Sequence, residues 1–276
     1  MSSTRPIRIA PPSRWPRLDI REIWAYRGLL RYLVWRNIRV RYAQTVLGAL
    51  WAVFRPGVTA LLFTVVFGRL AQMPSDGVPY PLFALCALVP WGYFAGATSA
   101  TGSSLVSNQR LITKVYFARL VIPLSALFTA LVDFSIAFAV LLIALLATGH
   151  SPSMTSFLTV PALVILMMIT ALGFGLWISA ATILYRDVGA IVAYGIQALL
   201  FVSPVVYSVS LVPETLRPLY AINPMATVIE GFRTSLLGTG TLSVEMVFAS
   251  MCTATVLLAS GVWYFRSMEH SFADVV

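Results

Sequence analysis

Long apolar runs, separated by short polar segments, are the feature that most limits how this chain can fold. A helix needs about 20 apolar residues to cross a bilayer, where only helices and closed barrels satisfy their backbone hydrogen bonds. Charged residues make up 11% of the chain, whereas a soluble domain contains about a quarter. We therefore predict an all-α polytopic membrane protein with six transmembrane helices, at Val46–Gly68, Tyr80–Thr101, Leu120–Ala147, Phe157–Tyr185, Val188–Tyr207 and Val244–Phe265.

The chain divides at about residue 45 into a basic segment and an apolar domain. Arginine occurs ten times in the first 41 residues, against only Asp19 and Glu22. Such an excess of positive charge keeps a segment in the cytoplasm near lipid headgroups, so membrane lipids rather than nucleic acid explain it. We assign 1–45 to a cytoplasmic tail and interface helix and 46–276 to the six-helix transmembrane domain, with both termini cytoplasmic.

The interface helix is expected between Asp19 and Tyr42. Apolar residues fall on one arc of a helical wheel and arginines on the other, which is typical of a helix lying in the membrane interface. Ile38 and Arg41 break this pattern. The helix either anchors the chain in the membrane or also contacts a partner subunit.

A polar segment, SSLVSNQRLITKVYFAR at residues 103–119, separates the second and third apolar runs and contains Lys114, the only lysine. Arg110, Lys114 and Arg119 have no acidic neighbour in this segment, so the positive-inside rule places it in the cytoplasm. Composition alone leaves two interpretations open, a plain connecting loop or a contact surface for another subunit.

The first apolar run contains an arginine, Arg55, followed by Pro56. An arginine within a span is costly unless it faces water or a partner or reaches the interface, and proline weakens the helix at the same place. With Trp51 and Phe54 nearby, this part of the run either lines a polar conduit or carries an arginine that snorkels to the interface.

Two other groups within the apolar runs are candidates for function. Trp91, Tyr93 and Phe94 cluster in the second run, where they either belong to an aromatic belt or line a path for sugars. Asp133 lies inside the third run. An acid at this depth is a functional candidate by default, although local hydrogen bonds could equally make it structural.

The hydropathy becomes irregular between the fifth and sixth runs, over residues 208–241. This stretch is rich in proline but too apolar for a solvated loop, and runs of about 10 to 14 residues indicate re-entrant or interfacial elements. We predict a re-entrant helical hairpin. Glu230 and Arg233, three residues apart on its second helix, could form a local ion pair.

The sequence lacks the residues that an enzyme active site needs. Two histidines and ten acids spread along the chain assemble neither a metal-ligand cluster nor a paired-carboxylate site. A P-loop requires Gly-Lys-Ser/Thr, but Lys114 lies between Thr113 and Val115. We therefore expect a transport subunit, not an enzyme, with no cofactor of its own; a gradient-driven transporter that acts alone remains the alternative.

Seven short sequence motifs, taken together and in their order along the chain, resemble those of the ABC-2 type permeases that export bacterial surface polysaccharides. They cover the chain from about residue 20 to 265, and their order and spacing are more specific than any one motif. Ala118 departs from the pattern, because the family often has proline before the arginine. The motifs are Gln44–Trp51 with Pro56, Val89–Phe94, Asn108–Arg119, Tyr185–Val188, Ser203–Tyr207, Asn223–Met225 and Glu230–Arg233.

The resemblance is strongest to the O-antigen and teichoic-acid exporter group. It implies a half-transporter of the bacterial inner membrane, in which two copies of the permease assemble with two copies of a separate ATPase that binds Mg-ATP. The implied substrate is a polysaccharide linked to undecaprenyl diphosphate, such as O-antigen. Teichoic acid, a small lipid or a drug are the alternatives within the same family.

The resemblance also implies roles for particular residues. Ser104–Phe117 would form a coupling helix that docks on the ATPase, and the turn at Tyr185–Asp187 would make a second contact. The expected coupling residues are Asn108, Arg110, Leu111, Lys114, Tyr116, Phe117, Arg119, Arg186 and Asp187. Flat aromatic faces with few fixed charges suit a sliding glycan, so the candidate substrate path is Trp51, Phe54, Arg55, Trp91, Tyr93, Phe94 and Tyr207.

Overall fold

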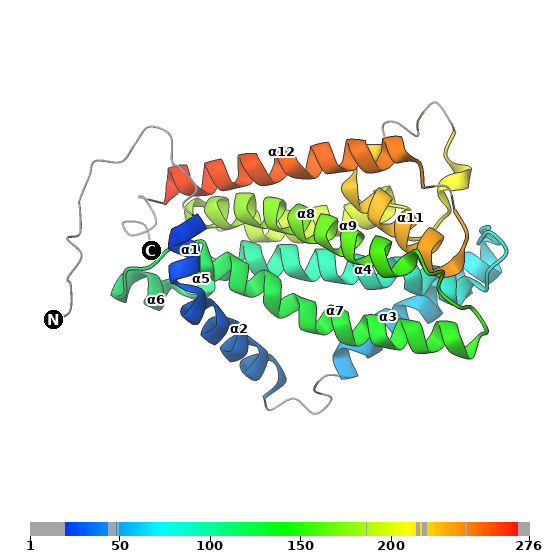
Figure 1. Ribbon diagram of the computed structural model, residues 1–276, viewed down its shortest axis with the longest axis horizontal. Helices are drawn as coiled ribbons and strands as arrows, with labels where there is room; N and C mark the ends of the chain where they lie inside the picture. Colours follow the sequence, from blue (N-terminus) through cyan, green and yellow to red (C-terminus); the bar gives the residue numbers. More distant parts are fainter. Residues whose placement is uncertain are drawn as a thin grey trace.

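The computed structural model describes residues 20–43, 48, 50–185, 187–213, 216, 220–240 and 242–269. The regular structure in these residues is entirely helical (Figure 1). Five helical segments are long and apolar enough to cross a membrane: Leu50–Leu70, which joins α3 (Leu50–Phe63) to the π-helix η1 (Thr64–Leu70), α4 (Tyr80–Gly102), α7 (Val121–Ala147), α8 (Ser156–Leu184) and α12 (Val244–Met268). The prediction of an all-helical, multi-pass membrane protein is confirmed.

The fifth predicted span corresponds to the shorter helix α9, Val188–Val202. Its 15 residues fall short of the roughly 20 that cross a bilayer at 1.5 Å per residue. The chain then becomes irregular before the 3₁₀ turn η2, Val209–Leu211. Five spans are therefore established by length and composition, and the sixth stays a prediction.

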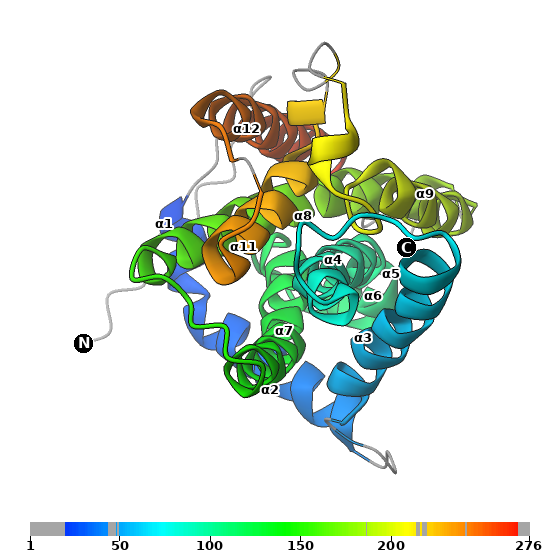
Figure 2. The same ribbon diagram turned by 90° about the vertical axis from the view of Figure 1, so that its right-hand side faces the viewer.

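Helix α4 forms the centre of the bundle, with α7, α8 and α3 around it (Figure 2). Phe83, Phe94 and many small residues of α4 are buried. Helix α12 packs on α8 at a close crossing, where a Cβ added at Gly261 would lie 2.6 Å from the Gly173 carbonyl oxygen. Glycine thus permits backbone contact between these helices, as is common in membrane proteins.

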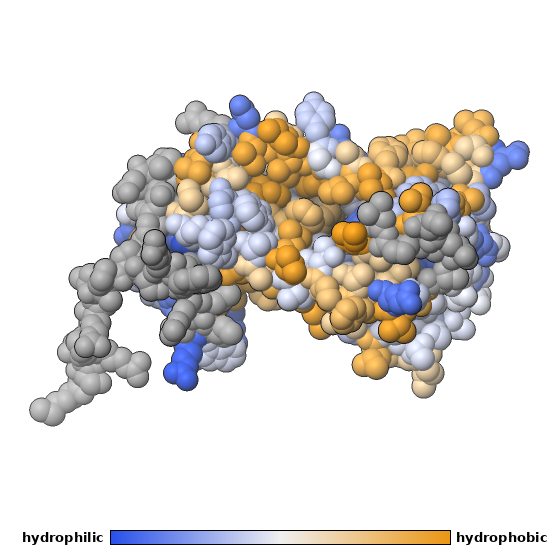
Figure 3. Space-filling view, turned by 90° about the horizontal axis from the view of Figure 1, so that it is seen from above, coloured by the Kyte–Doolittle hydropathy of each residue, from blue (hydrophilic) through white to orange (hydrophobic). Residues whose placement is uncertain are grey.

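The remaining surface of the bundle is mainly apolar. Apolar residues dominate the middle of the face shown in Figure 3. Helix α3 buries only Ala60, and α9 buries none of its residues against the rest of the chain. Their apolar side chains are therefore available to lipid or to another protein chain.

A second, smaller core lies at the end of the bundle that holds α1 (Ile20–Ala25), α5 (Ser104–Ser107) and α6 (Gln109–Lys114). We call this the α6 end. Leu33 of α2 (Arg27–Tyr42), Leu105 and Phe265 are almost fully buried in it. Arg266 of α12 lies 3.6 Å from Glu22 of α1, so the two described ends of the chain meet here.

Helix α11, Pro224–Leu237, occupies the irregular region between α9 and α12. Its start follows the rules for a helix N-terminus, because Asn223 caps the Met225 amide and Pro224 needs no hydrogen bond there. It ends at Gly238, whose φ is +69°. Helix α11 is largely buried against α8, α4 and α12; since residues 214, 215 and 217–219 lie outside the described part, the re-entrant hairpin stays a prediction.

Candidate functional site

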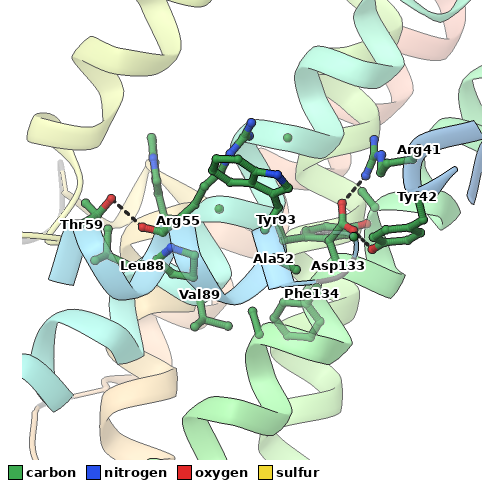
Figure 4. A pocket seen from close by; sticks show the side chains of 18 of the residues that line it. Arg41, Tyr42, Ala52, Arg55, Thr59, Leu88, Val89, Tyr93, Asp133 and Phe134 are labelled. Atoms are coloured by element: carbon green, nitrogen blue, oxygen red, sulfur yellow. Dashed lines mark hydrogen bonds and ion pairs between the residues drawn. The ribbon is translucent and has the colours of Figure 1, made fainter. Parts of the chain in front are cut away.

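A cavity lies where the end of α2 approaches α3, α4 and α7. Its volume is about 530 Å³. Figure 4 shows Arg55 at one side of this cavity and the group formed by Arg41, Tyr42 and Asp133 at the other. Polar side chains thus enter a pocket whose remaining walls come largely from apolar and aromatic residues.

Asp133 of α7 accepts hydrogen bonds from the last two residues of α2. The Arg41 guanidinium and the Tyr42 hydroxyl each donate to its carboxylate. Burial, and then the hydrogen bond to Asp133, raise the pKa of Tyr42 to about 12, so this hydroxyl stays protonated and keeps donating at neutral pH. Asp133 therefore holds the interface helix α2 against α7, and the hydrogen bonds described for it come from α2 and not from its own helix.

Arg41 and Tyr42 were not among the predicted site residues. The only sequence signal was that Arg41 breaks the amphipathic pattern, since its position on the apolar arc directs the charge toward the bundle. The two side chains of the Arg41–Asp133 pair remain 39% and 34% exposed, which leaves the pair open to solvent screening. It therefore holds α2 with a contact that is easily exchanged.

Arg55 reaches the cavity from α3. Pro56 removes one helical hydrogen bond at this place, and the Thr59 hydroxyl donates to the Arg55 carbonyl at 2.9 Å. The Arg55 guanidinium carbon lies 5.8 Å from the centre of the Trp51 ring. Among the described residues no carboxylate pairs with this guanidinium.

The structure brings four of the seven predicted path residues to this cavity: Trp51, Arg55, Trp91 and Tyr93. Phe54 makes an edge-to-face contact with Trp51, with centroids 5.5 Å apart, but does not line the cavity.

The other two predicted path residues lie elsewhere. Phe94 lines a neighbouring cavity of about 320 Å³, whose wall also includes Trp91. Tyr207 lies beyond the end of α9, where its hydroxyl contacts that of Tyr220. The seven residues therefore do not form one continuous lining in this chain.

The expected coupling segment is two short helices rather than one, since α5 ends at Ser107 and α6 begins at Gln109. Asn108 between them accepts a 2.6 Å hydrogen bond from Arg36 of α2 and donates to the Ser104 carbonyl at 2.8 Å. The interface helix is thus bonded to the middle of this segment.

Side chains of this segment divide into an outer and an inner set. Arg110, Lys114 and Tyr116 are exposed, the last at 86%, while Leu111 is half-buried. Phe117 is only 4% exposed and packs into the chain's own core, which fixes the segment and leaves this ring unavailable to a partner. The Arg119 guanidinium donates to the Glu269 backbone carbonyl, which joins the segment to the end of α12.

The second predicted contact is only partly described. Asp187 is exposed and precedes α9, but Arg186 lies outside the described residues. Within the described part, no group of three or more His, Cys, Asp and Glu side chains is arranged to hold a metal ion. The expectation that the chain carries no cofactor remains a prediction.

Arg233 of α11 is a buried cation away from the large cavity. It is 1% exposed and donates to the carbonyls of Val205 and Tyr207, each at 3.1 Å. Its guanidinium carbon lies 3.5 Å from the centre of the Phe83 ring. Arg233 therefore binds the irregular segment after α9 to both α11 and α4, whereas the sequence suggested only a local partner in Glu230.

The fold and the cavity together define a multi-pass helical membrane protein with a polar, aromatic-lined pocket among its helices. A model of the ABC-2 type transporter family matches residues 28–237, so the chain belongs to that family.

Its relatives include an O-antigen export system permease protein, RfbA, of Myxococcus xanthus, 29% identical over 93% of this chain and 98% of the relative. The RfbA permease of Klebsiella pneumoniae is 28% identical over 90% and 95%. The polysialic acid transport protein KpsM of Escherichia coli is 24% identical over 86% and 92%.

Proposed function

We propose that this chain is the membrane-spanning permease of a bacterial polysaccharide exporter, driven by ATP hydrolysis in a separate subunit. The observation that carries the proposal is the similarity to O-antigen and polysialic acid permeases over nearly the whole chain. The aromatic cavity agrees with it, because the exposed Trp51 ring offers a flat face to sugars while Arg55 and Asp133 supply polar contacts.

The proposed assembly contains two permeases and two ATPase subunits in the inner membrane, with the termini and the α6 end in the cytoplasm. The basic residues at the α6 end support this orientation. The uncovered apolar faces of α3 and α9 support a second copy of the chain beside them. The proposed substrate is a polysaccharide linked to undecaprenyl diphosphate, such as O-antigen.

The 104–117 segment is the proposed contact with the ATPase. Its exposed Arg110, Lys114 and Tyr116 offer charge and an aromatic ring to a partner, while buried Ile112 and Phe117 anchor it to the bundle. A rigid anchor transmits a push from the partner instead of absorbing it.

The test is charge reversal at the segment, with Arg110→Glu and Lys114→Glu combined. We expect a purified complex that still assembles and hydrolyses ATP but exports little glycan in cells. Arg69→Glu is the control, because Arg69 is an exposed arginine in η1, away from the α6 end. This variant should export normally. Wild-type export by the double variant would contradict the coupling role.

Depletion of the permease tests the substrate. Lipid-linked glycan labelled with a radioactive sugar should accumulate in the cytoplasm of depleted cells and disappear from their surface. Unchanged surface glycan would contradict polysaccharide export and favour a small-lipid or drug permease. If no ATPase copurifies and vesicles transport fully without ATP, a gradient-driven transporter replaces the proposal.

A further inference from the structure

Arg55 is a cation that the described part of the fold places at a cavity without an acidic partner. Three other arginines of the bundle have partners: Arg41 is bound by Asp133, Arg233 by two carbonyls, and Arg266 lies 3.5 Å from Glu269. A lone charge within an apolar helix is costly to keep in a membrane. Its presence beside a cavity therefore indicates an anionic ligand.

The charge balance of the cavity agrees with this indication. Two arginines, Arg41 and Arg55, line it with a single carboxylate, Asp133, which leaves one excess positive charge. Guanidinium groups suit phosphate because their donors form a planar fork that matches two phosphate oxygens. The Trp51 ring lies 5.8 Å from the Arg55 guanidinium carbon and adds an aromatic face to the same side of the cavity.

The position of Arg55 favours an anion attached to a lipid. It lies in the second turn of α3, a helix whose apolar side chains, such as Leu61 at 63% exposure, are uncovered by the rest of the chain. A ligand approaching along this face would keep its hydrocarbon chain in the membrane while its phosphate meets Arg55. Its sugars would then meet the Trp51 ring, which lines the cavity and is 43% exposed.

We propose that Arg55, assisted by Arg41, binds the phosphate group of a lipid-linked substrate at this cavity. This inference rests on the proposed export of a lipid-linked glycan and adds the place where its phosphate is held. Exchange of Asp133 for phosphate at Arg41 costs little, because the Arg41–Asp133 side chains are 39% and 34% exposed and solvent screens their attraction. Asp133 then takes Arg41 back when the ligand leaves, which prevents permanent binding.

The experiment measures binding of farnesyl diphosphate, a short polyprenyl diphosphate, to the full-length permease with its copurified ATPase in neutral phosphatidylcholine nanodiscs. We compare the wild type with Arg55→Gln, Arg55→Lys and Arg69→Gln. The last removes the same charge from the far end of the same span.

Arg55→Gln should raise the dissociation constant about tenfold. Arg55→Lys should raise it less, since the positive charge remains although the planar fork of guanidinium donors is lost. Arg69→Gln should bind like the wild type. Equal binding by the wild type and Arg55→Gln, with both proteins monodisperse and equally heat-stable, would overturn the proposal. If Arg55→Gln does not fold, the Arg55→Lys variant decides. Wild-type affinity of this variant at both low and high salt would overturn the proposal that the Arg55 guanidinium binds two phosphate oxygens.

A second series with phosphatidylglycerol in the nanodiscs separates the two sources of lipid phosphate. The proposal expects farnesyl diphosphate to bind with little competition from phosphatidylglycerol. If phosphatidylglycerol abolishes its binding through Arg55, the site serves a membrane phospholipid and the substrate assignment is wrong. If Arg55 proves not to bind phosphate, the depletion experiment described above can still show glycan export by this permease. Failure of this inference is therefore distinguishable from failure of the proposed function.

Discussion

Replacement of Arg233 by methionine should destabilise the protein more than any surface change. Methionine keeps most of the side-chain volume but cannot donate, so the carbonyls of Val205 and Tyr207 lose their partner in a buried site. Each unsatisfied buried acceptor costs about 1–3 kcal/mol, and a desolvated cation over a ring contributes about 2 kcal/mol.

Part of this cost is recovered, because methionine needs no hydration and the buried cation did. We therefore expect the free energy of unfolding to fall by about 2–4 kcal/mol in Arg233→Met. Arg233→Lys should lie between this variant and the wild type, since an ammonium group keeps the charge but cannot reach both carbonyls and cover the Phe83 ring together.

Thermal and denaturant unfolding of the purified protein in one detergent measures these differences. Arg69→Met is the matched control, because Arg69 is exposed and its replacement should change stability by less than about 0.5 kcal/mol. If Arg233→Met unfolds like Arg69→Met, the two carbonyl contacts do not hold the segment after α9. Protease cleavage within residues 203–212 should increase in Arg233→Met alone, which locates the loosened contact.

Three further outcomes follow from other contacts. Asp133→Asn should weaken the docking of α2 on α7, and a double-mutant cycle with Arg41→Gln should give a coupling free energy of about 0.5–1 kcal/mol from unfolding measurements. Asn108→Ala should increase amide hydrogen exchange in α6, because it removes the 2.6 Å bond from Arg36. Gly261→Ala should destabilise by about 1–3 kcal/mol in thermal unfolding, since its Cβ would meet the α8 backbone; in Gly195→Ala, with open space around the residue, stability should not fall.

The long helices could be predicted because the bilayer fixes their length and forces every backbone group into the helix. The second run was expected at Tyr80–Thr101 and is a helix over Tyr80–Gly102; the last was expected at Val244–Phe265 and ends at Met268. The length of an apolar run does not predict the helix where the helix is interrupted, as at α9, because proline and tertiary contacts then decide where the helix ends.

The partners of the polar residues could not be predicted. Asp133 and Tyr42 are 91 residues apart, and no local pattern specifies which helix end reaches an acid in another helix. Phe117 shows the same limit, since an aromatic residue in a polar loop reads equally as exposed to a partner or as an anchor in the core. Both outcomes depend on how the helices pack, which is a property of the whole bundle.

Helix α2 connects the two proposed working parts of the permease. Arg36 bonds to Asn108 in the proposed ATPase contact, and Arg41, five residues later, bonds to Asp133 at the cavity. Five residues of helix span only about 7.5 Å, so the two hydrogen bonds are joined by a helical segment that is too short to bend appreciably. A displacement of α6 that pulls Arg36 must therefore move Arg41 against Asp133, where the pair is exposed enough to exchange. These two bonds thus offer a direct mechanical route from the proposed ATPase contact to the proposed phosphate site, without requiring motion of the central helix α4.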